Sequence, residues 1–200
     1  MKRYMVEEAK FKKAMDAFDQ YNSKDPNQET ANGQSLPKEL LYAQRMTRRL
    51  LLYEPDSSEY LQLAARSQHI GRWEIARSGY PMDKKGYFQW RNKLKEHHAF
   101  IVEHILKNCG YDGLTIEKVK ELLMKKNLNT NTDAQVLEDV VCLVFLEHYV
   151  DEFAAKHEDE KVIDILRKTI KKMSAKVIRS VAELPLSDKI KSMIDAAVNG

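Results

Sequence analysis

Apolar residues recur at three- and four-residue intervals along most of the chain, which is the spacing of one face of an α-helix. The polar stretch 22–35 is predicted to be a loop, and no segment has the alternation of a strand. We therefore expect an all-α fold in a single compact domain that spans residues 1–200. The predicted helices cover about 2–20, 37–53, 59–76, 87–109, 115–127 and 131–157, with one or two more between 160 and 199.

The segment TDAQVLEDVVCLVFLEHYVDEF (132–153) has apolar residues around nearly the whole circumference of its helix, which is typical of a helix at the centre of a domain. Glu138 and Asp139 lie within it. A buried carboxylate is costly unless a cation, a metal or strong hydrogen-bond donors compensate it. One alternative is a set of basic residues from neighbouring helices: Arg66, Arg72, Arg91 and Lys168. The other is a divalent metal.

Two histidines are predicted to point into the core. Helical spacing places His69 on the same stripe as Leu61, and His98 on the same stripe as Leu94. With Asp139 they would supply the imidazole and carboxylate ligands that Fe, Mn, Zn or Co accept. Two interpretations stay open, a metal site made by these three residues and a buried polar network.

The segment SGYPMDKKGYFQWR (78–91) connects the two histidine-bearing helices. It combines turn-forming glycine and proline with aromatic rings and basic side chains. It is therefore either a lid over the site or an ordinary helix connection.

Two short stretches, HIGR at residues 69–72 and KMSAK at residues 172–176, resemble the signature motifs of class I aminoacyl-tRNA synthetases. In those enzymes the first motif follows a strand of a parallel α/β fold, where a helix N-terminus faces the ATP phosphates. Here it lies in a predicted helix with no strand before it. We therefore expect that the protein does not charge tRNA.

Charge and composition limit the kinds of molecule that the protein is expected to bind. The 33 Lys and Arg residues nearly balance the 30 Asp and Glu residues, so the net charge of +3 does not indicate nucleic-acid binding. No segment has the apolar run of a signal peptide or a membrane span, and we expect a cytoplasmic protein without membrane contact. The two cysteines lack a C-x-x-C partner, which favours reduced packing residues.

Several longer stretches, among them LPKELLYAQRM, LQLAARSQHIGRW, YPMDKKGYFQWRNKLKEHHA and LEDVVCLVFLEHY, together resemble the domain of unknown function 4202 family. That family carries no established activity. A weaker resemblance, carried by AARSQHIGR, is to the HD superfamily of all-α metal-dependent phosphohydrolases, and it implies an HD-like helical fold. The chain departs from that pattern, because Gln68-His69 stands where the His-Asp doublet is expected and the helix LLYAQRMTRRL has no histidine.

These observations lead us to expect a metal-dependent hydrolase that acts on a phosphorylated small molecule or nucleotide. His69, His98 and Asp139 are the expected metal ligands. Glu138 and Lys168 are the candidate catalytic residues, and Arg72, Arg91 and Lys172 are the candidates for holding the phosphate. The alternative is a non-catalytic helical protein that binds RNA or a protein partner and uses the buried charges as a structural network.

Overall fold

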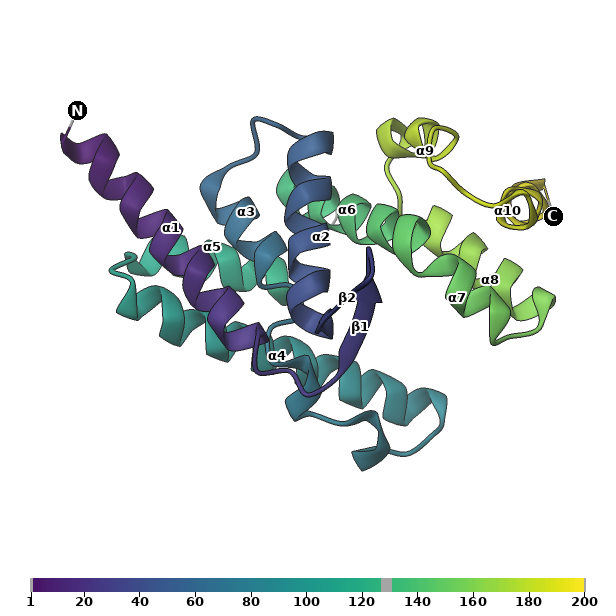
Figure 1. Cartoon of the computed structure of the whole chain (residues 1–200), viewed down its shortest axis with the longest axis horizontal. Helices are drawn as coiled ribbons and strands as arrows, with labels where there is room; N and C mark the ends of the chain where they lie inside the picture. Colours follow the sequence, from purple (N-terminus) through teal and green to yellow (C-terminus); the bar gives the residue numbers. More distant parts are fainter. Residues whose placement is uncertain (1, 127–130, 200) are drawn as a thin grey trace. The chain divides into compact units, whose positions relative to one another are not determined.

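The computed structural model describes residues 2–126 and 131–199, and the chain divides into two compact units. The N-terminal unit comprises Met1–Asn127 and the C-terminal unit comprises Leu128–Gly200. Among the described residues, strands occur only in one short two-stranded hairpin, and the remaining regular structure is helical (Figure 1). The predicted all-α class is confirmed.

The N-terminal unit is built from helices that share one apolar core. Its α-helices are α1 (Lys2–Asn22), α2 (Lys38–Tyr53), α3 (Glu59–Arg66), α4 (Lys84–Asn108) and α5 (Gly113–Leu123). Helix α3 packs against α2 and α5, α5 also packs against α4, and α1 contacts α2, α3 and α4. Fully buried side chains from these helices fill the space between them, including Phe18, Met46, Leu63, Val102 and Leu122.

A hairpin occupies residues 28–37, most of which were predicted to be a loop, so the prediction of no strand is wrong. Strand β1 (Gln28–Ala31) pairs antiparallel with β2 (Gln34–Pro37). The two residues between them, Asn32 and Gly33, have φ angles of 51° and 76°. Asn-Gly with positive φ at both positions is the preferred two-residue hairpin turn, and this signal was present in the sequence.

Helix α3 ends at Arg66, so the prediction of a helix over 59–76 is wrong beyond that residue. The Ser67 hydroxyl donates to the Leu63 carbonyl at 2.7 Å, and the chain then turns through residues 67–71. Gly71 adopts a left-handed φ of 66° and leads into a short 3₁₀ turn, Arg72–Glu74. His69 therefore lies in a tight turn between helices.

Gly71→Ala is expected to lower the free energy of unfolding by about 1–3 kcal/mol, because the left-handed backbone penalises a Cβ and the space is filled. An added Cβ would lie 2.5 Å from Ile101 Cδ1. Gly33→Ala is the matched control, since Gly33 also has a positive φ but a Cβ added there would have no atom within 4 Å. Urea unfolding should show the larger loss for Gly71→Ala, and equal losses would exclude a contribution from packing around Gly71.

The C-terminal unit contains α6 (Thr132–His148), α7 (Val150–Ala155), α8 (Asp159–Ile170), α9 (Ala175–Val181) and α10 (Asp188–Asn199). The Asn131 side chain caps α6 by accepting from the backbone N–H groups of Asp133 and Ala134. The predicted helix over 131–157 is interrupted at Tyr149, where ψ is −18° and φ is −128°. Within this unit α8 packs against α10, and α7 contacts both. In the described parts of the chain, no helix combines the length and the apolarity needed to cross a membrane.

Candidate functional site

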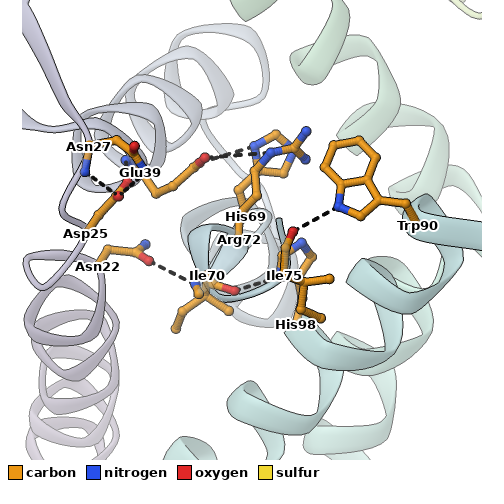
Figure 2. Close-up of polar contacts among 11 residues, drawn as sticks. Asn22, Asp25, Asn27, Glu39, His69, Ile70, Arg72, Ile75, Trp90 and His98 are labelled. Carbon is orange, nitrogen blue, oxygen red and sulfur yellow. Dashed lines mark hydrogen bonds and ion pairs between the residues drawn. The ribbon is translucent and has the colours of Figure 1, made fainter. Parts of the chain in front are cut away.

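The turn at residues 67–71 is fixed in the N-terminal unit by two side chains that reach its backbone (Figure 2). Asn22, at the end of α1, accepts a hydrogen bond from the Gly71 N–H at 3.3 Å. His98, from α4, donates its Nδ1–H to the Ile70 carbonyl at 2.6 Å. Because Nδ1 carries the proton, the Nε2 atom of neutral His98 is an acceptor. His98 is buried, as predicted, and burial lowers its pKa to about 3.

Glu39, in the first turn of α2, is positioned by Asp25. One carboxylate oxygen of Asp25 accepts from the backbone and side chain of Asn27, and the other accepts from the Glu39 backbone N–H at 3.0 Å. Asp25 therefore caps α2 from a residue that precedes the hairpin. This places the Glu39 side chain in the interior, where it is 6% exposed.

Glu39, His69 and Arg72 form what we call the acid–base cluster, and Figure 2 shows the Glu39 carboxylate facing the other two side chains. Glu39 Oε2 lies 3.4 Å from His69 Nδ1, and Glu39 Oε1 lies 3.7 Å from Arg72 Nε. Arg72 Nη1 lies 3.5 Å from His69 Nε2. The Tyr42 ring stacks on the imidazole, with a centroid distance of 4.1 Å. A carboxylate, an imidazole and a guanidinium thus meet in one place.

Trp90 of α4 supports the guanidinium of Arg72. The Arg72 Cζ atom lies 4.8 Å from the centroid of the Trp90 ring, which is within the range of a cation–π interaction. The indole Nε1–H donates to the Ile75 carbonyl at 2.9 Å, so the ring itself is held in place. The side chains of His69 and Arg72 are 20% and 23% exposed, and the cluster therefore has an edge that water reaches.

Electrostatics separate the protonation behaviour of the three groups. Burial raises the pKa of Glu39 to about 7, although the Arg72 charge acts in the opposite direction. Burial lowers the pKa of His69, and the charges of Arg72, Arg91 and Lys125 lower it further. Near neutral pH the site therefore combines a neutral imidazole, a carboxyl group that exchanges its proton, and an excess of positive charge.

The structure brings four predicted residues together in the N-terminal unit. His69 and Arg72 belong to the acid–base cluster, and the ring centroids of His69 and His98 are 6.0 Å apart. Arg91 is near enough for its charge to act on both His69 and Arg72. Glu39 was not predicted from the sequence. It lies in the first turn of a helix, where an acidic residue is common because it interacts favourably with the helix N-terminus.

The remaining predicted residues lie in the C-terminal unit. Asp139 is buried and accepts from the Ser174 backbone N–H at 2.8 Å, the Ser174 hydroxyl and the Gln135 amide. Glu138 is also buried, and the exposed Lys172 ammonium lies 3.8 Å from its Oε1 atom. The exposed Lys168 pairs with Asp164 one helical turn earlier. Neutral hydrogen-bond donors thus contribute to the compensation that the buried charge of Asp139 requires.

The metal site predicted from His69, His98 and Asp139 draws on both units and stays a prediction. Across residues 2–126 and 131–199, no group of three or more His, Cys, Asp or Glu side chains is arranged to hold a metal ion. His98 has the hydrogen bond to a backbone carbonyl that metal-binding histidines commonly make. His69 has a guanidinium beside Nε2, which disfavours a second cation at that atom.

A family model described as "Domain of unknown function (DUF4202)" matches residues 12–194, nearly the whole chain. The chain belongs to the DUF4202 family. In this DUF4202 protein the matched region includes both the acid–base cluster and the surroundings of Asp139. No curated protein and no solved structure matches the chain. The resemblance of the DUF4202 protein to HD phosphohydrolases stays a prediction.

Proposed function

We propose that this DUF4202 protein hydrolyses a phosphorylated small molecule at the acid–base cluster. The observation that carries the proposal is the convergence of Glu39, His69 and Arg72 at an edge that water reaches. The three residues come from α2 and from the two turns after α3. Such a set supplies both a proton acceptor and an anion-binding group, which phosphate-ester hydrolysis requires.

Arg72 is the group best placed to bind the phosphate. A guanidinium can donate two parallel hydrogen bonds to phosphate oxygens, and Trp90 holds that of Arg72 from one side. Arg91 and Lys125 add positive charge to the same region, as their effect on His69 indicates. The negative charge of Glu39 offsets part of this positive charge. Because burial raises its pKa to about 7, Glu39 is only partly ionised at neutral pH.

Glu39 is the candidate general base. Its carboxylate takes a proton from a water molecule while the water oxygen forms a bond to phosphorus and the bond from phosphorus to the ester oxygen breaks. The leaving oxygen takes a proton from solvent at the exposed edge, and Glu39 returns its proton to solvent before the next turnover. Neutral His69 contacts both Glu39 and Arg72 and keeps the carboxylate oriented.

A divalent metal would add a second way to activate the water. Of the predicted ligands, His98 has the arrangement that fits this role better than His69 does. In the metal-dependent form of the proposal, His69, His98 and Asp139 would hold Fe, Mn, Zn or Co, and the chemistry that such an ion would supply is a lower pKa of the attacking water. Hydrolysis in the presence of a chelator separates the two forms of the proposal, because only the form that relies on Glu39 persists there.

The test is release of inorganic phosphate from a panel of sugar phosphates, aryl phosphates and nucleotides by the full chain, with and without chelator. Hydrolysis of at least one compound is expected. Arg72→Lys should raise KM about tenfold or more, because lysine keeps the charge but loses the paired hydrogen bonds. Arg48→Lys, at an exposed position of α2, is the matched control and should behave like the wild type.

Two outcomes would contradict the proposal. The first is a protein that releases no phosphate from any compound, with or without added metal. The second is an activity that Arg72→Lys leaves unchanged, which would locate the reaction elsewhere. In either case the acid–base cluster is a buried structural network, and the alternative of a non-catalytic helical binding protein is favoured.

A further inference from the structure

The first turn of α4 and the residues just before it present large apolar side chains to solvent, close to the acid–base cluster. Met82, Tyr87 and Phe88 are 81%, 44% and 54% exposed. An exposed group of this kind commonly marks a site of interaction. The exposed Lys84 and Lys85 lie between these residues in the sequence, so the surface is both aromatic and basic.

The backbone around these residues is tightly held. Asp83 caps α4 by accepting from the Gly86 N–H at 2.7 Å. A Cβ on Gly86 would lie 2.1 Å from the Pro81 carbonyl oxygen, so the two chain segments touch. Arg77 donates to the Tyr80 carbonyl at 3.0 Å and to the Asp83 carbonyl at 3.4 Å. A surface fixed in this way binds a ligand without a large cost of ordering.

Tyr87 connects this surface to the acid–base cluster. Its ring centroid lies 6.0 Å from that of Trp90, whose indole supports Arg72. The Arg72 Cζ atom in turn lies 4.8 Å from the centroid of the Trp90 ring, so Tyr87 and Arg72 both approach the same indole. Trp90 therefore connects an exposed aromatic ring to the guanidinium proposed to bind phosphate.

We infer that the ligand of the acid–base cluster is a phosphate monoester with a flat aromatic group, whose ring stacks on Tyr87 while its phosphate binds Arg72. This inference rests on the proposed function and names its substrate class. Stacking of a planar ring on an aromatic side chain needs no particular pattern of hydrogen bonds. Lys84 and Lys85 strengthen the attraction for an anionic ligand. Tyr87 is thus the residue that determines specificity for the organic part.

Isothermal titration calorimetry with the full chain tests this inference. The probes are adenosine 5′-monophosphate, phenyl phosphate, ribose 5-phosphate and adenosine. The two aromatic phosphates should bind about tenfold more tightly than ribose 5-phosphate, which is the size of effect that one stacking contact supplies. Tyr87→Ala should remove this preference and leave the affinity for ribose 5-phosphate unchanged, whereas Tyr87→Phe should retain the preference.

Phe100→Ala is the matched control, because Phe100 is another exposed aromatic residue of α4 and is 62% exposed. It should bind all four probes like the wild type. Equal affinities for the three phosphate compounds, or a preference for the aromatic phosphates that survives Tyr87→Ala, would overturn the inference and leave the proposed function intact. Binding of adenosine as tightly as its monophosphate would instead count against phosphate recognition, and binding of no probe would overturn both.

Discussion

Glu39→Gln is expected to reduce the rate of phosphate-ester hydrolysis about 10²- to 10⁴-fold, the range that a positioned general base contributes. Glutamine has nearly the shape of glutamate but cannot accept the proton of the attacking water. Because Arg72 is unchanged, KM should change much less than kcat. Steady-state kinetics of phosphate release give both constants, and unfolding curves establish that the variant protein is folded.

The pH dependence makes this result specific for Glu39. Since its pKa is raised to about 7 by burial, the carboxylate form increases across neutral pH, and the wild-type rate should rise through about pH 7. The residual rate of Glu39→Gln should lack this rise. Glu96→Gln, at an exposed position of α4, is the control and should keep the wild-type profile. A Glu39→Gln rate within threefold of wild type would show that another group is the base.

Acidification below about pH 6.5 is expected to destabilise the folded protein by about 1.4 kcal/mol per pH unit for each histidine that folding keeps neutral. Burial lowers the pKa of His98 from 6.5 to about 3, so between these values the unfolded chain binds a proton that the folded chain does not. The stabilisation is complete above pH 6.5 and is lost progressively as the pH falls toward 3. Burial lowers the pKa of His69 in the same direction.

Glu39 has the opposite sign. Its pKa rises from 4.5 to about 7 on folding, so its proton favours the folded state at low pH and this contribution is lost as the pH rises through 7. The contribution of this one carboxyl group offsets that of one of the two histidines. Acidification therefore still causes a net loss of folding stability. Urea unfolding at a series of pH values gives the free energy of unfolding as a function of pH. The slope of this plot between pH 3 and 6.5 should be about 1.4 kcal/mol per pH unit smaller for His98→Asn than for the wild type. The control is His104→Asn, at an exposed position of the same helix, and a slope unchanged in His98→Asn would contradict the prediction.

The burial of His98 and Asp139 could be predicted from the sequence because both lie in long helices, where the apolar period fixes which side chains face inward. The same reasoning failed for His69. Its apolar neighbours continue the helical period past Arg66, whereas the backbone turns at Ser67 and Gly71. The helix ends where the Ser67 hydroxyl bonds to the Leu63 carbonyl, and periodicity alone carries no information about such a local bond.

The role of Glu39 was out of reach for a different reason. Its burial depends on Arg72 and His69, which meet it only after α2 and the turns that follow α3 are packed together. The contacts of Asp25 could be predicted only in part. The Asp-Pro-Asn sequence indicates a local turn closed by the aspartate side chain, which the structure contains. Its second bond, to the Glu39 backbone, joins residues on either side of the hairpin.

Because of that second bond, the hairpin is a loop whose two ends are held together, and we call this loop the branch. The branch is closed at its base twice, by the Lys38 N–H on the Asn27 carbonyl at 2.9 Å and by the Glu39 N–H on Asp25. The position of Glu39 is therefore set by the base of the branch, and the length of the branch has little influence on it. A side chain added at Gly33, at the tip, would point into open space. The tip is accordingly a natural attachment point for a fluorescent label or an affinity tag that must leave the acid–base cluster undisturbed.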